Sequence, residues 1–347
     1  MKLECLPEDR HEEAVEFLAS AFATSRDAPF LSRELRHWKY YRPHPFWRDT
    51  RCYVYRDAVG LTAHGGFCPV QYSAGDGVKT SFQLIDWAST DQRCPGAGFL
   101  LFRELWTQAD SHLGIGGSDD AQQVMRRIPG LRKMDAMAVC AYPLRPWGQL
   151  VESPWSWKSP LKLARSWGWR IARKRPRLDS WKAVPAERLS EADADLLVPA
   201  GNGGYCPLRR VPDLVNYWLE CPAARVRAWR LQYAGAGVGL VVLAFLRKQT
   251  RIVDLVVNTA SAPLAEAFSV AIDLAAQDRD ACELVGASSA APVVQAMVDA
   301  GMIPRGRSDI FFGDSHKRFP PNLPIEVNLT VGDGFYLQEN QPGFLSF

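Results

Sequence analysis

The sequence predicts an α/β (α+β) chain of two consecutive units, each with a mixed, mostly antiparallel central sheet flanked by helices. Three observations predict this. The chain has 347 residues, enough for two domains of ordinary size. Its apolar content of 47% supports sizeable cores, while a charged content of 23% argues against disorder. The order of helical and extended patterns in residues 11–142 recurs in residues 181–318.

The first half begins with an amphipathic helix over residues 11–22, in which Ala14, Leu18 and Phe22 share one face. A second helix is predicted over 31–40. The turn at 74–77 contains two glycines and an aspartate, which is a strong hairpin signal. The full pattern predicts strands at 51–56, 60–72 and 78–89, a helix at 99–110, a strand at 113–117, a helix at 119–127 and a strand at 134–142.

The second half is predicted to repeat this order. Its turn at 258–263 contains neither an arginine nor a glycine. Because an anion needs close approach to the main chain, we do not expect this turn to hold one. The predicted elements are a helix at 211–219, strands at 225–233, 237–248 and 251–257, a helix at 262–276, a strand at 282–287, a helix at 291–300 and a strand at 309–312.

The corresponding turn of the first half reads Arg93-Cys94-Pro95-Gly96-Ala97-Gly98 and lies between a strand and a helix. Unpaired N–H groups converge at a helix start, the helix dipole adds positive potential, and glycines leave room for a ligand. The turn therefore predicts an anion site. The alternative is an ordinary strand-to-helix turn in which the glycines provide tightness.

An arginine followed by glycines at the fourth and sixth positions resembles the pyrophosphate loop of the GCN5-related N-acetyltransferases (GNAT), which bind acetyl-CoA. The order of elements in about the first 142 residues is also similar to that family. The resemblance implies two tandem GNAT-like domains with a degenerate second copy. The expected boundaries are 1–144 for the acetyl-CoA-binding domain, 145–180 for a linker, and 181–347 for the C-terminal copy.

The resemblance also implies which residues contact acetyl-CoA. The strand before the loop is expected to separate from its neighbour at a bulge, where its main chain pairs with the pantetheine arm. The loop amides would hold the pyrophosphate. The residues expected to bind acetyl-CoA are Trp87, Ala88, Ser89, Arg93, Cys94, Pro95, Gly96, Ala97, Gly98 and Phe99.

Three side chains are candidates for proton transfer. Asp86 lies in an apolar strand, where a carboxylate is expected to have a raised pKa that suits a base. Its alternative role is to bond neighbouring groups only. His64 is a competing base because imidazole titrates near neutral pH, although a lone strand histidine is more often structural. The helix at 119–127 lacks the tyrosine that commonly protonates the thiolate in this family, so Tyr142, Tyr72 or solvent is expected to do so.

Composition excludes several classes of protein. The acidic N-terminus is unlike a secretory signal, and the longest apolar run, 238–246, is too short to span a bilayer. The eight cysteines include no C-x-x-C pair and the six histidines no H-x-x-x-H pair, so neither a disulfide framework nor a metal site is predicted. We therefore expect a cytoplasmic protein.

Residues 145–177 contain nine basic side chains, one acidic side chain and five tryptophans. This segment either packs between the two halves or contacts an anionic membrane through residues 158–177, which would place the protein peripherally at the inner membrane face. Nothing in it resembles a base-reading module, so no specific nucleic-acid partner is expected.

These observations favour an acyl-CoA-dependent N-acyltransferase that uses acetyl-CoA in its first half to modify a small-molecule amine. The aromatic and basic segment 22–47 suits a sugar ring, which favours an amino-sugar or surface-polysaccharide precursor as acceptor. One alternative is an aminoacyl-tRNA-dependent, FemABX-like peptidyltransferase, which the intact loop opposes. The other is a non-catalytic regulatory module that binds CoA or a membrane.

Overall fold

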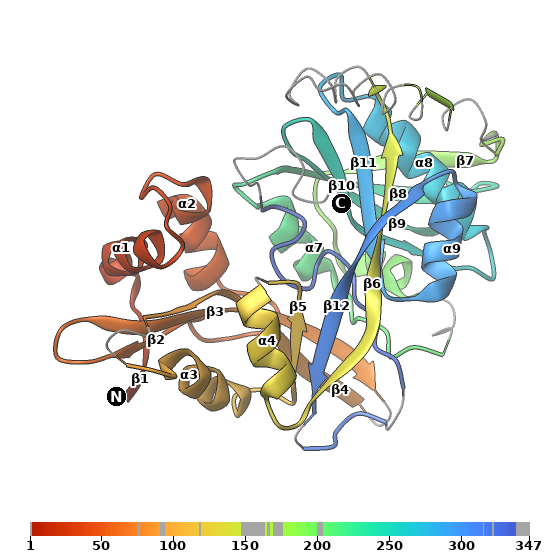
Figure 1. The fold of residues 1–347 in the computed structure, drawn as a ribbon. Helices are drawn as coiled ribbons and strands as arrows, with labels where there is room; N and C mark the ends of the chain where they lie inside the picture. The colour runs from red at the N-terminus through yellow and green to blue at the C-terminus, as the bar shows by residue number, and fades with distance from the viewer. Residues whose placement is uncertain are drawn as a thin grey trace.

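The computed structural model describes residues 2–74, 77–90, 94–117, 119–146, 164, 167–168, 176–199, 204–314, 316–320 and 323–337 (Figure 1). Arg93 lies outside the described residues, and so does almost all of the segment 158–177 that was predicted to contact a membrane. Within the described ranges, no helix is both long enough and apolar enough to cross a membrane.

The first half of the chain contributes six strands to the sheet, with helices between them. The strands are β1 (Lys2–Cys5), β2 (Cys52–Arg56), β3 (Leu61–Ala74), β4 (Gly77–Ser89), β5 (Ser111–Ile115) and β6 (Leu131–Pro143). The helices are η1 (Glu8–Arg10), α1 (His11–Ala21), η2 (Pro29–Leu31), α2 (Arg33–Arg36), the π-type turn η3 (His37–Tyr41), α3 (Ala97–Trp106) and α4 (Asp119–Arg127).

The second half repeats this arrangement and ends in the longest of its strands. The strands are β7 (Trp181–Ala186), β8 (Arg225–Tyr233), β9 (Ala236–Phe245), β10 (Gln249–Val257), β11 (Glu283–Ser288) and β12 (Ile303–Gly313). The helices are η4 (Glu191–Leu197), α7 (Pro212–Leu219), α8 (Leu264–Ala276) and α9 (Ala291–Asp299).

All of these strands form a single sheet, in the order β1-β2-β3-β4-β5-β12-β6-β11-β10-β9-β8-β7. The sequence predicted a separate sheet for each half, and that prediction is corrected here. The last strands of the two halves are exchanged, because β12 pairs with β5 while β6 pairs with β11. β6 and β12 also pair with each other at the centre of the molecule (Figure 1). The exchange satisfies the backbone groups along β5 and β11 that would otherwise form open edges.

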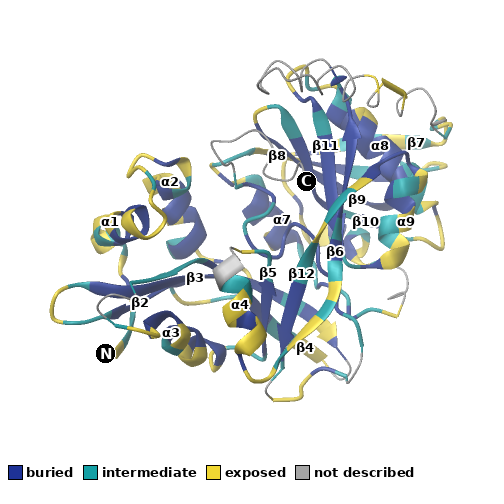
Figure 2. Ribbon diagram, in the orientation of Figure 1, coloured by how far each residue is buried: buried dark blue, intermediate teal, exposed yellow. Residues whose placement is uncertain are grey.

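Helices cover both faces of the first half of the sheet. α1 and α2 lie on one face, where Leu18 packs with Ile85 of β4, and α3 lies on the other, where Leu101 packs with Phe82 (Figure 1). The alternation of β4 side chains between the two cores follows from the period of a strand. The buried residues form continuous layers along the strands, and the outer faces of α1 and α3 are exposed (Figure 2).

Three predicted elements differ from the structure, and the last two differences have clear causes. The predicted helix at 31–40 divides into η2, α2 and η3. The predicted strand at 113–117 ends at Ile115, because Gly116 and Gly117 have φ of 66° and 89°, in the left-handed region. The predicted strand at 309–312 begins instead at Ile303, because it pairs with β6 along that length.

Candidate functional site

The strand β4 carries a bulge at Asp86. Its pairing with β3 shifts register between His64 and Gly66, which face Ala88 and Ile85. Asp86 has a φ of 50°, which a non-glycine residue adopts only where its surroundings impose it. Bulges of this kind bend a strand and redirect its side chains, often beside a binding site. The bulge that the resemblance implied in this strand is therefore present, at Asp86 and Trp87, and pairing of residues 87–89 with a ligand stays a prediction.

β4 and β5 separate after a short stretch of parallel pairing. Ser81, Phe82 and Gln83 pair with Ser111, His112 and Leu113. Beyond Gln83, β4 continues to Ser89 with no further pairing to β5 among the described residues. Within the part of the chain that the structure describes, no strand pairs with this edge of β4 beyond Gln83, and an exposed strand edge of this kind can pair with an extended ligand.

The start of α3 lies directly beyond this divergence. Gly96, the N-cap of the helix, has a φ of 79°, and a Cβ there would meet no atom within 4 Å. Gly98 packs closely on β4, since a Cβ there would lie 3.0 Å from Ser89 Oγ. Trp87 Nε1 donates to the Gly98 carbonyl oxygen at 3.1 Å, which ties the helix to the strand. In the first turn, the Ala97 N–H donates to the Cys94 main-chain oxygen at 3.1 Å, while the N–H groups of Gly98 and Phe99 have no intrahelical acceptor.

The Asp86 carboxylate forms a buried ion pair. Lys39 Nζ and the Tyr40 hydroxyl, both from η3, donate to the same carboxylate oxygen. The side chains of Lys39 and Asp86 are only 1% and 7% exposed. Burial alone would raise the pKa of Asp86, but the Lys39 charge and these hydrogen bonds outweigh it and lower the pKa. The raised pKa expected from the sequence is thus corrected, because the sequence does not show which cation faces the strand.

His64 lies under the bulge and is fully buried. Its Nδ1 lies 2.8 Å from the Asp86 main-chain oxygen and therefore donates to it, while Nε2 lies 3.3 Å from Cys52 Sγ. Burial, followed by the charge of Arg36, lowers the pKa of His64 to about 4. The imidazole is neutral at pH 7 and supports the bulge.

Tyr142 is not brought to this cluster. It lies in β6 and packs in the core of the second half together with Trp229 and Phe268. Tyr72, the other tyrosine considered, donates to the Glu326 main-chain oxygen at 3.0 Å. Neither tyrosine is hydrogen-bonded to Asp86 or His64 in the described structure.

The sequence analysis missed the C-terminal segment 323–337. This segment passes between the two halves and places Asp333 near Asp86, Lys39 and Arg251. Burial, and then repulsion by Asp86, raises the pKa of Asp333 to about 6. The available sequence signal is a Gly-Asp-Gly triplet at 332–334, which indicates a tight turn but not its location.

The second half carries an aspartate at the position equivalent to Asp86. Asp254 follows the last residue of β10 paired with β11 by three positions, as Asp86 follows the last residue of β4 paired with β5. Its carboxylate is bonded by Arg210 through Nε at 2.6 Å and Nη2 at 3.1 Å. The motif Leu-Ile-Asp of β4 and Ile-Val-Asp of β10 is a repeat that the sequence analysis overlooked.

The turn before α8 differs from the turn before α3. The N–H groups of Ser261 and Ala262 donate to the Asn258 main-chain oxygen, and that of Ala260 donates to its side chain. Pro263 occupies the N-cap and has no N–H to offer. The amides of this turn are therefore already satisfied within the protein.

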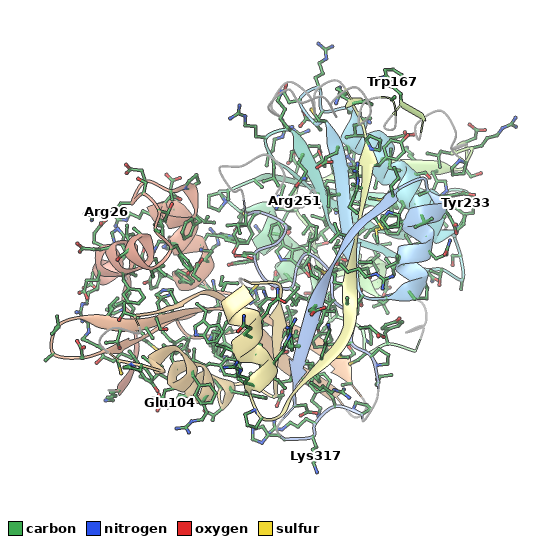
Figure 3. All side chains as sticks on the ribbon, in the orientation of Figure 1. Arg26, Glu104, Trp167, Tyr233, Arg251 and Lys317 are labelled. Atoms are coloured by element: carbon green, nitrogen blue, oxygen red, sulfur yellow. The ribbon has the colours of Figure 1, made fainter. Side chains whose placement is uncertain are left out.

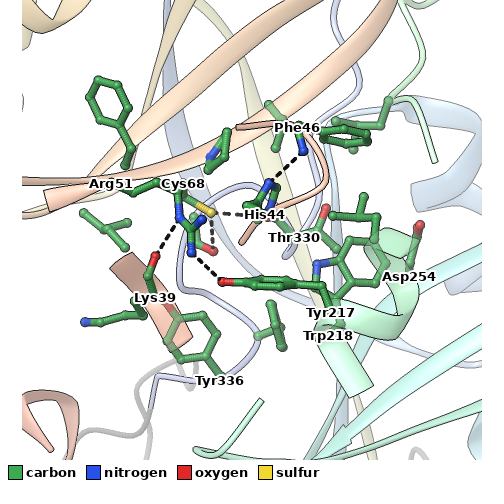
Figure 4. Close-up of a pocket in the computed structure, with 18 of the residues that line it drawn as sticks. Lys39, His44, Phe46, Arg51, Cys68, Tyr217, Trp218, Asp254, Thr330 and Tyr336 are labelled. Carbon is green, nitrogen blue, oxygen red and sulfur yellow. Dashed lines mark hydrogen bonds between the residues drawn. The ribbon is translucent and has the colours of Figure 1, made fainter. Parts of the chain in front are cut away.

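A cavity lies between the halves beside Lys39 and Ile85 (Figure 4). Its volume is about 30 Å³, room for one or two water molecules. Arg51 lines the cavity, and its guanidinium donates hydrogen bonds to the main-chain oxygens of Trp38, Lys39 and Arg42. Among the described residues, no group of three or more His, Cys, Asp and Glu side chains is arranged to hold a metal ion.

Comparison with solved structures shows a shared fold. A GCN5-related N-acetyltransferase from Anabaena variabilis ATCC 29413 matches with a TM-score of 0.58 at 12% identity, over 90% of this chain and 72% of that chain. A GCN5-related N-acetyltransferase from Kribbella flavida matches with a TM-score of 0.51 at 14% identity, over 90% and 71%. The sequence matches no protein-family model and no curated protein. The chain therefore has a GNAT-like fold over most of its length.

Proposed function

We propose that this protein is an acyl-CoA-dependent N-acyltransferase that uses acetyl-CoA and carries its active site in the first half. The observation that supports this most strongly is the combination of a bulged strand, its divergence from β5 and an open glycine N-cap at the end of that strand. Together these features offer a line of main-chain donors and acceptors that ends in a positive helix start.

The residues present suit the parts of acetyl-CoA. The open edge of β4, at Trp87–Ser89, would pair with the amides of the pantetheine arm. The first turn of α3 would hold the pyrophosphate, because no side chain at Gly96 blocks the approach. The thioester supplies an activated acyl group, and the chain supplies orientation and exclusion of water.

The strand-to-helix turn and the bulge aspartate also distinguish the two halves. In the turn at 258–263, the amides of residues 260–262 are bonded to Asn258, and Pro263 occupies the helix N-cap where α3 has the open Gly96. Asp254 is held by Arg210 on both oxygens, whereas Asp86 bonds Lys39 and Tyr40 through one. We therefore place donor binding in the first half and assign the second half a supporting role.

The acceptor is proposed to be a small amine. The cavity beside Lys39 has room for only one or two water molecules and does not admit a sugar. An amino sugar is the first acceptor to test because the segment 22–47 is aromatic and basic in sequence.

The donor site is tested by calorimetry with acetyl-CoA. In Gly96→Glu, the new carboxylate would face the pyrophosphate, and binding should weaken by roughly 100-fold or more. Gly235→Glu is the matched control, because Gly235 also has a positive φ, 86°, has no atom within 4 Å of the position that a Cβ would take, and lies in the β8–β9 turn. The control should bind as the wild type does. Absence of binding by the wild type, or equal binding by Gly96→Glu, would refute the proposal.

A further inference from the structure

The segment 323–337 is held between the halves by buried hydrogen bonds from both. From the first half, Cys68 Sγ of β3 donates to the Gly332 oxygen at 3.2 Å. From the second half, Arg251 of β10 donates from Nη1 to the oxygens of Gly334 at 2.7 Å and Leu337 at 2.8 Å. Arg251 lies inside the molecule, whereas Arg26, Glu104 and Lys317 lie at its periphery (Figure 3). Asp333 is thus fixed from both sides.

This segment approaches β4 where β4 and β5 separate. Gly332 has a φ of 98°, and a Cβ there would lie 2.8 Å from Gln83 Nε2. Gln83 is the last residue of β4 that pairs with β5, and its Nε2 donates to the Ile115 oxygen at 3.4 Å. Gly332 therefore lies against the point at which β4 and β5 separate. Asp333 is the next residue and lies on the same side as Asp86 and Lys39.

Several charged and titratable groups face Asp333. Asp86 of β4 repels its negative charge, while Lys39 of η3 and Arg251 of β10 attract it. Cys68 of β3 and Tyr336 of the same segment also lie close enough to interact with it. Burial is the largest influence, and the balance leaves a carboxylate that titrates at a pKa of about 6. Carboxylates in this range are typical general bases.

We propose that Asp333 is the catalytic base of this transferase, which accepts a proton from the acceptor ammonium beside the thioester. The proposal rests on the proposed function above. It means that the C-terminal segment, rather than β4 or α4, completes the active site of the first half.

The proposed step conserves atoms and charge. The Asp333 carboxylate takes one proton from the acceptor R–NH3⁺ and leaves a neutral amine. The amine nitrogen attacks the thioester carbonyl carbon, so a C–N bond forms and the C–S bond breaks. A second N–H proton passes to the departing thiolate, which leaves as CoA–SH. Asp333 then releases its proton to solvent.

The neighbouring groups are less suited to this role. The pKa of Asp86 is lowered by its pairing with Lys39, so it is a weaker base than Asp333. His64 is fully buried, and its Nδ1 already donates a hydrogen bond to the Asp86 main-chain oxygen. We assign Asp86, Lys39 and His64 to positioning the bulge and setting the charge around Asp333.

The first test is Asp333→Asn, with Asp179→Asn as control because Asp179 is exposed in the turn before β7. Thiol release is measured with acetyl-CoA and the best acceptor from a panel of primary amines and amino sugars. We expect kcat/KM to fall about 100- to 10,000-fold in Asp333→Asn, with acetyl-CoA affinity changed by less than about threefold. The control should match the wild type.

Folding of the variant is checked by its thermal midpoint. Because the pKa of folded Asp333 is raised, its ionisation lowers stability as pH rises through 6. Asp333→Asn should therefore melt higher than the wild type at pH 8 and similarly at pH 4. A residue with a purely structural role would not combine higher stability with lost transfer.

The second test uses the pH profile of kcat/KM. The wild-type profile should rise through pH 6 to a plateau. Asp86→Asn removes the repelling charge and should move this rise to lower pH. Arg251→Gln removes an attracting charge and should move it slightly higher. A rise that stays at the same pH in Asp86→Asn would contradict the assignment of this titration to Asp333.

The outcomes separate the two proposals. If acetyl-CoA binds and Asp333→Asn transfers as fast as the wild type, the role of Asp333 is refuted while the transferase function stands. If acetyl-CoA does not bind, or if no amine in the panel releases thiol, the function fails and the role of Asp333 fails with it.

Discussion

At the scale of single residues, burial decides how much an ion pair matters. The pair of Lys39 and Asp86 is almost fully enclosed, whereas Lys133 pairs with Asp309 at the surface, where the two side chains are 55% and 24% exposed. A buried charge that loses its partner cannot recover its solvation in water, but an exposed one can.

We therefore expect Lys39→Met to lower the free energy of unfolding by about 3–5 kcal/mol, because it leaves the Asp86 carboxylate buried and unpaired by a cation. The matched change Lys133→Met should cost no more than about 1 kcal/mol. Urea denaturation of both variants provides the comparison. Equal losses in the two would show that the Lys39 pair is not protected from solvent.

The site residues also show which features a local sequence pattern can predict and which it cannot. Gly96 and Gly98 could be predicted because their roles, a left-handed N-cap and a close helix–strand contact, depend only on residues a few positions away in the chain. The lowered pKa of Asp86 could not, because it depends on Lys39, 47 residues earlier. A strand pattern shows that a carboxylate is enclosed but not what encloses it.

At the scale of elements, one buried cation ties the C-terminal segment to the second half. Arg210 bonds Asp254 of β10 and also donates from Nη2 to Glu326 at 2.6 Å. Asn328 Nδ2 adds a bond to the Asp254 carboxylate at 3.1 Å. The segment that carries Asp333 is thus anchored at its beginning by a fully bonded charge network.

Arg210→Met should destabilise the protein by about 3–5 kcal/mol, because it leaves two carboxylates without their cation. Arg230→Met is the control: Arg230 also forms a two-bond pair, with Asp193, but its side chain is 33% exposed. The control should lose about 1 kcal/mol or less. Chemical denaturation at pH 7 measures both, and a small loss in Arg210→Met would mean that the network does not anchor the segment.

At the scale of the whole molecule, the exchange of β6 and β12 makes each half depend on the other. β5 receives its outer partner from the end of the chain, and β11 receives its partner from the first half. Neither half can complete its part of the sheet alone. The predicted boundaries at 1–144 and 181–347 therefore describe stretches of sequence whose strands pair across the boundary.

This predicts how a cut chain behaves. With a protease site inserted between residues 150 and 160, the cleaved halves should co-elute in size-exclusion chromatography and unfold in a single transition. Residues 1–146 expressed alone should aggregate, because β5 and β6 then lack β12 between them. Two halves that separate as folded monomers would contradict this.

The sequence by itself predicted the α/β class and the order of most elements, because helical and strand periods are set by neighbouring residues. It missed the two edge strands, β1 and β7. It also predicted a glycine-containing turn at the start of α3, where Gly96 is the N-cap, while anion binding at that turn stays a prediction. The tertiary structure alone decided that the halves share one sheet, that Lys39 faces Asp86, and that Asp333 reaches the bulge. Each of these depends on residues far apart in the chain, and the energy of such contacts depends on burial, which no local pattern records.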